Sequence, residues 1–122
     1  MTNTFASLGV PAPIVKQLTD RGIDSAFPIQ VATIPDSLAG RDICGKAPTG
    51  SGKTIAFGIP MVAAVKRAAP KRPKGLVLAP TRELAIQVAD ELSLLGDLRV
   101  LAVYGVAGIE PQIKKLRAGV DI

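Results

Sequence analysis

Apolar residues along this chain follow two different spacings, and the two spacings alternate. GLVLAP (75–80) and RVLAVYG (99–105) are almost continuous apolar runs, which is typical of buried strands in a parallel sheet. Between them, TRELAIQVADELSLLG (81–96) repeats an apolar residue at helical spacing, so one face of a helix is expected to be buried. The residues of that face are Leu84, Val88, Leu92 and Leu95. The pattern predicts a strand, a helix and a second strand.

The alternation extends over the whole chain, and glycine and proline residues mark the ends of the expected elements. Pro35 predicts a kink or break in its helix, and Gly58 with Pro60 predict a kink or an early end in the next. Repeated strand–helix units indicate an α/β fold with a parallel sheet covered by helices on both faces. Helices are expected at 11–22, 28–40, from Lys53 onward, 81–96 and 109–119, and strands at 42–47, 75–80, 99–105 and 119–122.

The composition is that of a globular chain with an aliphatic core, because 48% of its residues are hydrophobic and 3% are aromatic. The net charge of +5 favours anionic partners such as nucleotides or nucleic acid, and solubility alone explains it equally well. With no histidine and one cysteine, a zinc site and a histidine-based triad are excluded. We interpret Cys44 as a small buried hydrophobe. Because no signal peptide is visible, a reducing, cytoplasmic compartment is expected.

One charge run stands out. KRAAPKRPK (66–74) carries five positive charges and no acidic residue, and its prolines place it in a surface loop. Such runs are usually only solvated. Contact with nucleic acid is the alternative interpretation of this loop.

The segment APTGSGKT, between an expected strand and an expected helix, has the pattern of a phosphate-binding loop. Glycines let the backbone fold tightly and approach a phosphate, and the start of the helix adds its unsatisfied N–H groups. Lys53 is placed to reach the β- and γ-phosphates of a nucleotide, and the Thr54 hydroxyl to bind Mg²⁺. The pattern therefore predicts a nucleotide site made by Ala47, Pro48, Thr49, Gly50, Ser51, Gly52, Lys53 and Thr54.

Hydrolysis of the nucleotide needs more than this loop, because a carboxylate at the end of a neighbouring strand also holds the metal. The expected strands 75–80 and 99–105 do not end in an acidic residue, and Asp121 lies inside the last expected strand. We therefore expect the chain to bind a nucleotide without hydrolysing it, as a fragment of a larger enzyme would.

APTGSGKT with alanine first, together with PTREL (80–84), resembles the first RecA-like domain of the DEAD-box ATP-dependent RNA helicases. FPIQ (27–30), VYG (103–105) and GVDI (119–122) fit the same family. The resemblance implies a RecA-like phosphate-loop NTPase domain that stops before the Asp-Glu-Ala-Asp strand. It divides the chain into an adenine-recognition segment at 1–40 and a partial RecA-like domain at 41–122, with the second RecA-like domain absent.

Particular residues acquire roles through this resemblance. Gln30 corresponds to the glutamine that reads adenine, and Phe5 to the upstream aromatic residue that stacks on the base. From the residues alone, Phe5 would more often belong to the core. The PTREL segment and the VYG glycine correspond to contacts with the RNA backbone, made without regard to base sequence. The implied RNA-contact residues are Pro80, Thr81, Arg82, Glu83 and Gly105.

Some positions depart from the family pattern. Ala26 and Phe27 stand where proline and a hydroxyl residue are usual, and Val106 replaces the second glycine after the tyrosine. The family's duplex unwinding uses two domains, so this chain alone is expected to be inactive in unwinding. Its uncovered strand edges are expected to cause self-association. Two other functions remain open: a nucleotide- or RNA-binding module without hydrolysis, and an unrelated phosphate-loop enzyme such as a small kinase.

Overall fold

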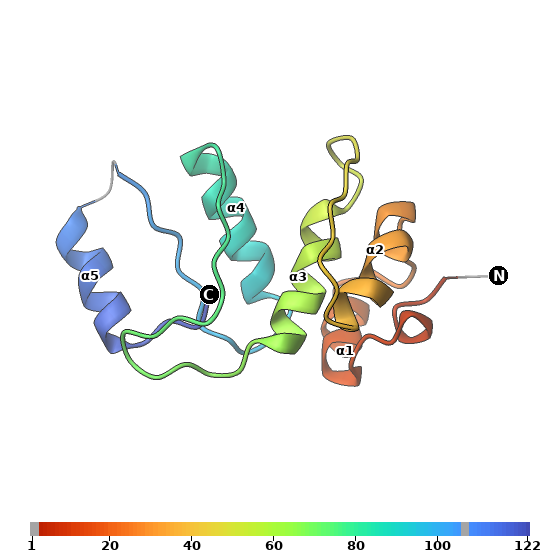
Figure 1. Ribbon diagram of the computed structural model, residues 1–122, viewed down its shortest axis with the longest axis horizontal. Helices are drawn as coiled ribbons and strands as arrows, with labels where there is room; N and C mark the ends of the chain where they lie inside the picture. The colour runs from red at the N-terminus through yellow and green to blue at the C-terminus, as the bar shows by residue number, and fades with distance from the viewer. Residues whose placement is uncertain (1–2, 106–107) are drawn as a thin grey trace. The chain divides into compact units, whose positions relative to one another are not determined.

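The computed structural model describes residues 3–105 and 108–122, and the chain forms two compact units, 1–64 and 65–122 (Figure 1). Val106 lies outside the described residues. The boundary expected at 40/41 lies within the first unit. That unit holds η1 (Ala6–Leu8), α1 (Ala12–Asp20), α2 (Pro28–Leu38) and α3 (Lys53–Ala64), and the second holds α4 (Arg82–Ser93) and α5 (Ile109–Ala118).

The helices of the first unit begin and end close to the expected residues. Pro13 lies in the first turn of α1, where its missing N–H costs nothing, and Gly22 follows the helix with a φ of 75°. Helices α2 and α3 pack against each other. The buried apolar side chains of this unit are Phe5, Val10, Ile14, Leu18, Ile34, Ala56 and Ile59.

The proline and glycine positions inside the helices do not interrupt them. Helix α2 is continuous across Pro35, and α3 continues past Gly58 and Pro60 to Ala64. The expected break in α2 and the expected early end of α3 are therefore wrong. A proline in a helix costs about 3 kcal/mol. Packing of α2 on α3, which buries Ile34 and Ile59 completely, offsets this cost.

Within the described ranges, no segment forms a β-strand, and the one bridge is an isolated antiparallel pair of Thr4 and Ser25. The expected strand at 42–47 is irregular, and Cys44 is exposed. Our interpretation of Cys44 as buried is therefore wrong, because no hydrogen-bonded strand neighbours flank this segment within its own unit.

The second unit contains the beginning of a parallel arrangement. Ile122 donates its N–H to Arg99 O (3.2 Å) and accepts from Leu101 N–H (3.0 Å), which is the pattern of two parallel strands. On the other side, Asp121 O accepts from the N–H groups of Lys74 and Gly75. Segment 121–122 thus lies between the segments that begin at 74 and 99, and joins them only at that end.

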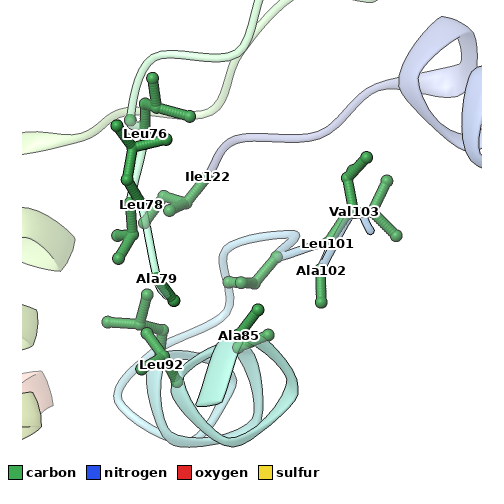
Figure 2. Close-up of a pocket in the computed structure, with 14 residues that line it drawn as sticks. Leu76, Leu78, Ala79, Ala85, Leu92, Leu101, Ala102, Val103 and Ile122 are labelled. Atoms are coloured by element: carbon green, nitrogen blue, oxygen red, sulfur yellow. The ribbon is translucent and has the colours of Figure 1, made fainter. Parts of the chain in front are cut away.

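Beyond Ile122 the two flanking segments diverge around an apolar hollow of about 340 Å³. Figure 2 shows Leu76, Leu78 and Ala79 on one side, Leu101, Ala102 and Val103 on the other, and α4 across the floor. Leu76 and Leu78 are 77% and 86% exposed. A continuous sheet is absent here because the backbone groups of 76–79 and 101–103 have this hollow between them instead of a strand.

The buried face of α4 differs slightly from the expected one. Val88, Leu92 and Leu95 are buried as expected, but Leu84 is 38% exposed. The hollow is lined by Ala85, Val88, Ala89 and Leu92, which are spaced by three or four residues. Ala85 therefore takes the inward position in the first turn. In the part of the chain that the structure describes, no helix is long and apolar enough to cross a membrane.

Candidate functional site

The loop before α3 has the backbone of an anion-binding turn. Gly50 and Gly52 have φ values of 82° and 85°, which L side chains rarely adopt. Ser51 bonds back to Pro48 O through both its N–H and its hydroxyl, which closes the loop. Helix α3 starts at Lys53, so the N–H groups of its first turn have no acceptor within the helix. These free donors and the helix dipole fit the charge of a phosphate group.

Lys53 and Thr54 are the first two residues of α3. The Lys53 side chain is exposed, and Thr54 is partly buried. An exposed ammonium group can reach a phosphate, and a hydroxyl oxygen is a ligand that Mg²⁺ accepts. The residues present therefore fit a magnesium-bound nucleotide, as the sequence predicts.

Gln30 is 2% exposed and connects α2 to the phosphate loop. Its Oε1 accepts a hydrogen bond from Phe27 N–H (2.8 Å), and its Nε2 donates one to Gly52 O (3.1 Å). The first bond is half of a capping box, because Gln30 is the third residue of α2 and satisfies the N–H of the residue before the helix. The second bond joins residues 22 positions apart. The structure thus brings the expected base-reading residue to the expected phosphate loop.

Gly52 packs closely against this amide. A Cβ built at Gly52 would overlap Gln30 Nε2 and would come within 2.9 Å of the Phe27 ring. A Cβ at Gly50 would meet nothing within 4 Å. Both glycines have a positive φ, so the difference between them is the contact with Gln30.

We expect Gly52→Ala to destabilise the chain more than Gly50→Ala. Gly50→Ala has only the cost of the left-handed backbone, about 1–2 kcal/mol. Gly52→Ala adds the steric overlap with Gln30, roughly 1–3 kcal/mol more. Urea unfolding of both variants measures the difference, and equal losses would show that the contact between Gly52 and Gln30 is not tight.

Phe5 and Phe27 lie in different environments. Phe5 is 2% exposed and belongs to the core of the first unit, whereas Phe27 is 53% exposed. Stacking of Phe5 on a base requires one face of its ring to become uncovered, so that role stays a prediction. Phe27 has no hydroxyl, and its N–H is held by Gln30 instead.

The PTREL residues lie in the second unit, at the start of α4. Thr81 is the N-cap, and its hydroxyl accepts a hydrogen bond from Leu84 N–H (3.2 Å). Arg82 and Glu83 form an exposed ion pair of 3.2 Å, which contributes little stability. Pro80 is exposed beside them. Pro80, Arg82 and Glu83 are exposed to a ligand, and the nearby helix N-terminus favours an anion.

Gln112 of α5 holds the segment that leads to Gly105, and no sequence pattern indicated this contact. Its Oε1 accepts from Tyr104 N–H (3.0 Å), and its Nε2 donates to Tyr104 O (3.1 Å). The Gln112 side chain therefore satisfies both backbone groups of Tyr104, as a neighbouring strand would. Gly105 follows directly and is exposed.

Asp121 and Arg99 form a second contact that was not expected from the sequence. Asp121 is 0% exposed and accepts hydrogen bonds from the backbone N–H groups of Ala68 (2.6 Å) and Arg99 (2.7 Å). The Arg99 guanidinium adds a bond of 2.9 Å and also donates to Ala68 O. The hydrogen bond from Arg99 lowers the pKa of Asp121 far below its ordinary value of 3.8. The Asp121 carboxylate therefore ties the loop at Ala68 to the segment at Arg99 and stabilises the second unit.

The stability of the chain is expected to fall in acid through Asp121. Because its pKa is lower in the folded chain, its contribution is complete above the ordinary value of 3.8 and is lost as the pH falls through the folded pKa. Asp121→Asn should lower the free energy of unfolding by about 2 kcal/mol at neutral pH. Urea unfolding at pH 7 and pH 3 measures this. A variant that loses as much stability in acid as the parent chain would contradict the assignment.

Comparison with known proteins gives a consistent result. The family model described as DEAD/DEAH box helicase matches residues 27–122. DEAD-box ATP-dependent RNA helicase 9 of Oryza sativa is 46% identical over 96% of this chain and 19% of its own length. ATP-dependent RNA helicase CshA of Listeria monocytogenes is 45% identical over 97% of this chain and 23% of its own length. The chain thus spans only about a fifth of these relatives.

Solved structures show the same similarity. A crystal structure of a DEAD box protein from Methanococcus jannaschii matches 98% of this chain and 33% of its own, with 36% identity and a TM-score of 0.89. The RNA-helicase Prp28 from Chaetomium thermophilum, bound to ADP, matches 98% of this chain and 30% of its own, with 37% identity and a TM-score of 0.85.

Proposed function

Because the chain belongs to the DEAD/DEAH box helicase family, we propose that it is the nucleotide-binding and RNA-contacting part of an ATP-dependent RNA helicase. The relatives named above are ATP-dependent RNA helicases, and one of the similar structures carries ADP. The parent protein would couple ATP hydrolysis to the unwinding of an RNA duplex. Within that cycle, this chain would hold adenine, the phosphates and part of the RNA backbone.

The observation that carries this proposal is the bond from Gln30 to Gly52 of the phosphate loop. A glutamine amide has two N–H donors and two lone pairs on its oxygen, so the two existing bonds together leave one N–H and one lone pair of Gln30 for a ligand. Adenine offers a matching pair, the N6 amine and N7, whereas guanine offers two acceptors on the same edge. Gln30 is buried, so reading adenine requires the base to take the place of the groups that cover the amide.

The phosphates would bind at the start of α3. The free N–H groups of the loop and first turn donate to phosphate oxygens, and Lys53 adds a positive charge. Thr54 would hold Mg²⁺, which when bound neutralises the charge on the phosphates. The support for these roles is the positive φ of the loop glycines and the position of both side chains at the helix start.

RNA would be contacted in the second unit by Arg82 and by the exposed backbone around Thr81 and Gly105. Support comes from the N-cap geometry of Thr81 and from the weak, exposed pairing of Arg82 with Glu83, which a phosphate can replace. Such binding depends on phosphate charge and is therefore insensitive to base sequence and sensitive to salt.

We expect this chain to bind nucleotide without turning it over. The segments 75–80 and 99–105 do not end in a carboxylate that could share Mg²⁺ with Thr54, and Asp121 is engaged by Arg99. A phosphate-release assay with ATP, Mg²⁺ and RNA tests this. If the parent chain releases phosphate from ATP and Lys53→Ala does not, the expectation is contradicted. Hydrolysis would then need no residues other than those of this chain.

Self-association through the apolar hollow is also expected. Leu76 and Leu78 expose large apolar surfaces beside unpaired backbone groups, which favours pairing with another chain. Sedimentation velocity over a dilution series should show dimers or larger species that dissociate. A lysine on an exposed edge opposes such pairing. Leu78→Lys should therefore give monomers, and an exclusively monomeric parent chain would contradict the expectation.

A further inference from the structure

A concentration of positive charge lies in the second unit, away from the PTREL residues. The loop 66–74 runs beside the C-terminal end of α5 (Figure 1). There, Lys71 N–H donates to Leu116 O (3.2 Å). This contact adds three cations of α5 to the five of the loop, and all eight side chains are exposed. We call them the basic patch: Lys66, Arg67, Lys71, Arg72, Lys74, Lys114, Lys115 and Arg117.

The two segments that make up the basic patch contain little negative charge: the loop 66–74 has no acidic residue, and α5 has one, Glu110. Glu110 lies in the first turn of α5, at the opposite end of that helix. Asp121 is buried and already engaged by Arg99. Lys115 and Arg117 also lie in the last turn of α5, where their positive charges interact favourably with the negative end of the helix dipole. That explanation covers two of the eight cations and leaves the loop residues unexplained.

The loop is held in place, which a merely solvated loop does not require. Ala68 N–H donates to Asp121 Oδ1 (2.6 Å), and Ala68 O accepts from Arg99 (2.7 Å). Arg72 N–H closes a turn onto Ala69 O (3.1 Å), and Lys74 N–H donates to Asp121 O (2.9 Å). The cationic side chains therefore extend from a fixed backbone.

Lys71 adds an independent observation. Its φ of 63° is the one positive φ at a residue other than glycine in the described ranges. The turn from Ala69 to Arg72 would be less strained with glycine there, because a Cβ is disfavoured in this region. Backbone strain of this kind is concentrated at ligand-binding and functional sites. The strained position carries a cation of the basic patch.

We propose that the basic patch is a second site for the RNA phosphate backbone, separate from the PTREL contact. The ligand class rests on the function proposed above. Lys74 precedes and Pro80 follows the segment 75–79, so the two sites lie at opposite ends of it, roughly 20 Å apart at about 3.3 Å per residue. One RNA single strand can therefore contact both sites only if several nucleotides span the distance between them.

RNA is favoured over a membrane surface by the lack of apolar side chains in the basic patch. A peripheral membrane site combines cations with large apolar residues that enter the lipid. Among the described residues, the exposed large hydrophobic side chains all lie outside 66–74 and 113–118. Charge without apolar anchors is the pattern of phosphate-backbone binding.

The test is fluorescence anisotropy of the full chain with a labelled single-stranded oligouridylate over a series of salt concentrations. Arg72→Gln/Lys115→Gln should weaken binding roughly tenfold at low salt. It should also reduce the slope of log affinity against log salt by about 1.4, because each of the two lost phosphate contacts contributes about 0.7 on a single strand. The matched control, Lys16→Gln/Arg41→Gln, removes the same charge from exposed residues of the first unit and should change the affinity less than about twofold.

Lys71→Gly separates binding from folding. The substitution removes a cation and relieves the positive φ, so the thermal midpoint should be unchanged or higher while RNA binding weakens. Tighter or unchanged RNA binding by this variant would count against the basic patch. A purely structural role for the loop predicts that stability and binding change in the same direction.

Several results would overturn the inference. The first is that the parent chain does not bind RNA at low salt. The second is that the patch pair and the control pair weaken RNA binding equally. The third is that the patch pair, Arg72→Gln/Lys115→Gln, loses binding to phosphatidylserine vesicles but binds RNA as the parent chain does. ADP–Mg²⁺ binding is measured on the same samples. If ADP binds and Arg82→Gln weakens RNA binding while the patch pair does not, the basic patch fails and the proposed function stands.

Discussion

Replacing Lys53 with alanine is expected to weaken ADP–Mg²⁺ binding by at least about tenfold. Lys53 is the first residue of α3 and follows a loop whose free N–H groups fit a phosphate. Its ammonium group carries a full positive charge at the start of the helix. The loss of its charge-assisted hydrogen bond to a phosphate accounts for the expected loss of about tenfold in affinity for ADP. Isothermal titration of ADP–Mg²⁺ into both proteins measures the change.

The neighbouring Lys46 provides a matched control for Lys53. It is also exposed and lies just before the loop, so Lys46→Ala removes the same charge nearby without removing a group at the helix start. The control should bind ADP within about twofold of the parent chain. Equal losses in the two variants would mean that general charge, and not the position of Lys53, attracts the nucleotide.

Replacing Gln30 with alanine is expected to lower both the stability of the first unit and its affinity for ADP. The substitution leaves Phe27 N–H and Gly52 O without their partner at a partly buried position. The loss of two such bonds should reduce the free energy of unfolding by about 2–4 kcal/mol. Urea unfolding and ADP titration of the same variant measure the two effects.

Two further variants identify the cause of the Gln30 effect. Gln30→Glu keeps the oxygen that accepts from Phe27 N–H but loses the donor to Gly52 O, so ADP binding should fall even if α2 remains capped. Gln17→Ala removes an exposed glutamine of α1 and should change neither quantity. If Gln30→Glu binds ADP as the parent chain does, the bond to Gly52 has no role in the nucleotide site.

The helices of this chain were predictable because their limits are local. Pro13 and Gly22 delimit α1, and Thr81 begins α4 as an N-cap, each through chemistry within a few residues. The absence of a break in α2 at Pro35 has a non-local cause. A proline penalty can be read from sequence, but the packing of α2 on α3 that offsets it cannot.

The residues of the candidate site were predictable, but their contacts were not. The phosphate loop follows from glycine spacing and from the change from strand to helix pattern. The Gln30–Gly52 bond joins residues 22 positions apart, and the buried Arg99–Asp121 pair joins another two with the same separation. Distant polar pairs of this kind leave no periodic signal. The same holds for the contact of Lys71 with α5, which assembles the basic patch.

The expected sheet depended on neighbours that the described residues do not provide. The apolar runs at 75–80 and 99–105 predicted strands, and no strand forms there, because a strand forms only when its backbone groups find partners. Ile122 supplies such partners at one end, and the hollow of about 340 Å³ lies where the others would be. Periodicity identifies candidates for pairing and says nothing about which pairs form.

The most direct measurement is an equilibrium titration of the chain with ADP–Mg²⁺, followed by competition with GDP–Mg²⁺. If Gln30 and the phosphate loop form one adenine-nucleotide site, ADP binds saturably and GDP does not displace it. Equal binding of both nucleotides would show a phosphate site with no base recognition by Gln30. Failure of both to bind would contradict the central claim that the Gln30–Gly52 contact assembles a nucleotide site in this chain.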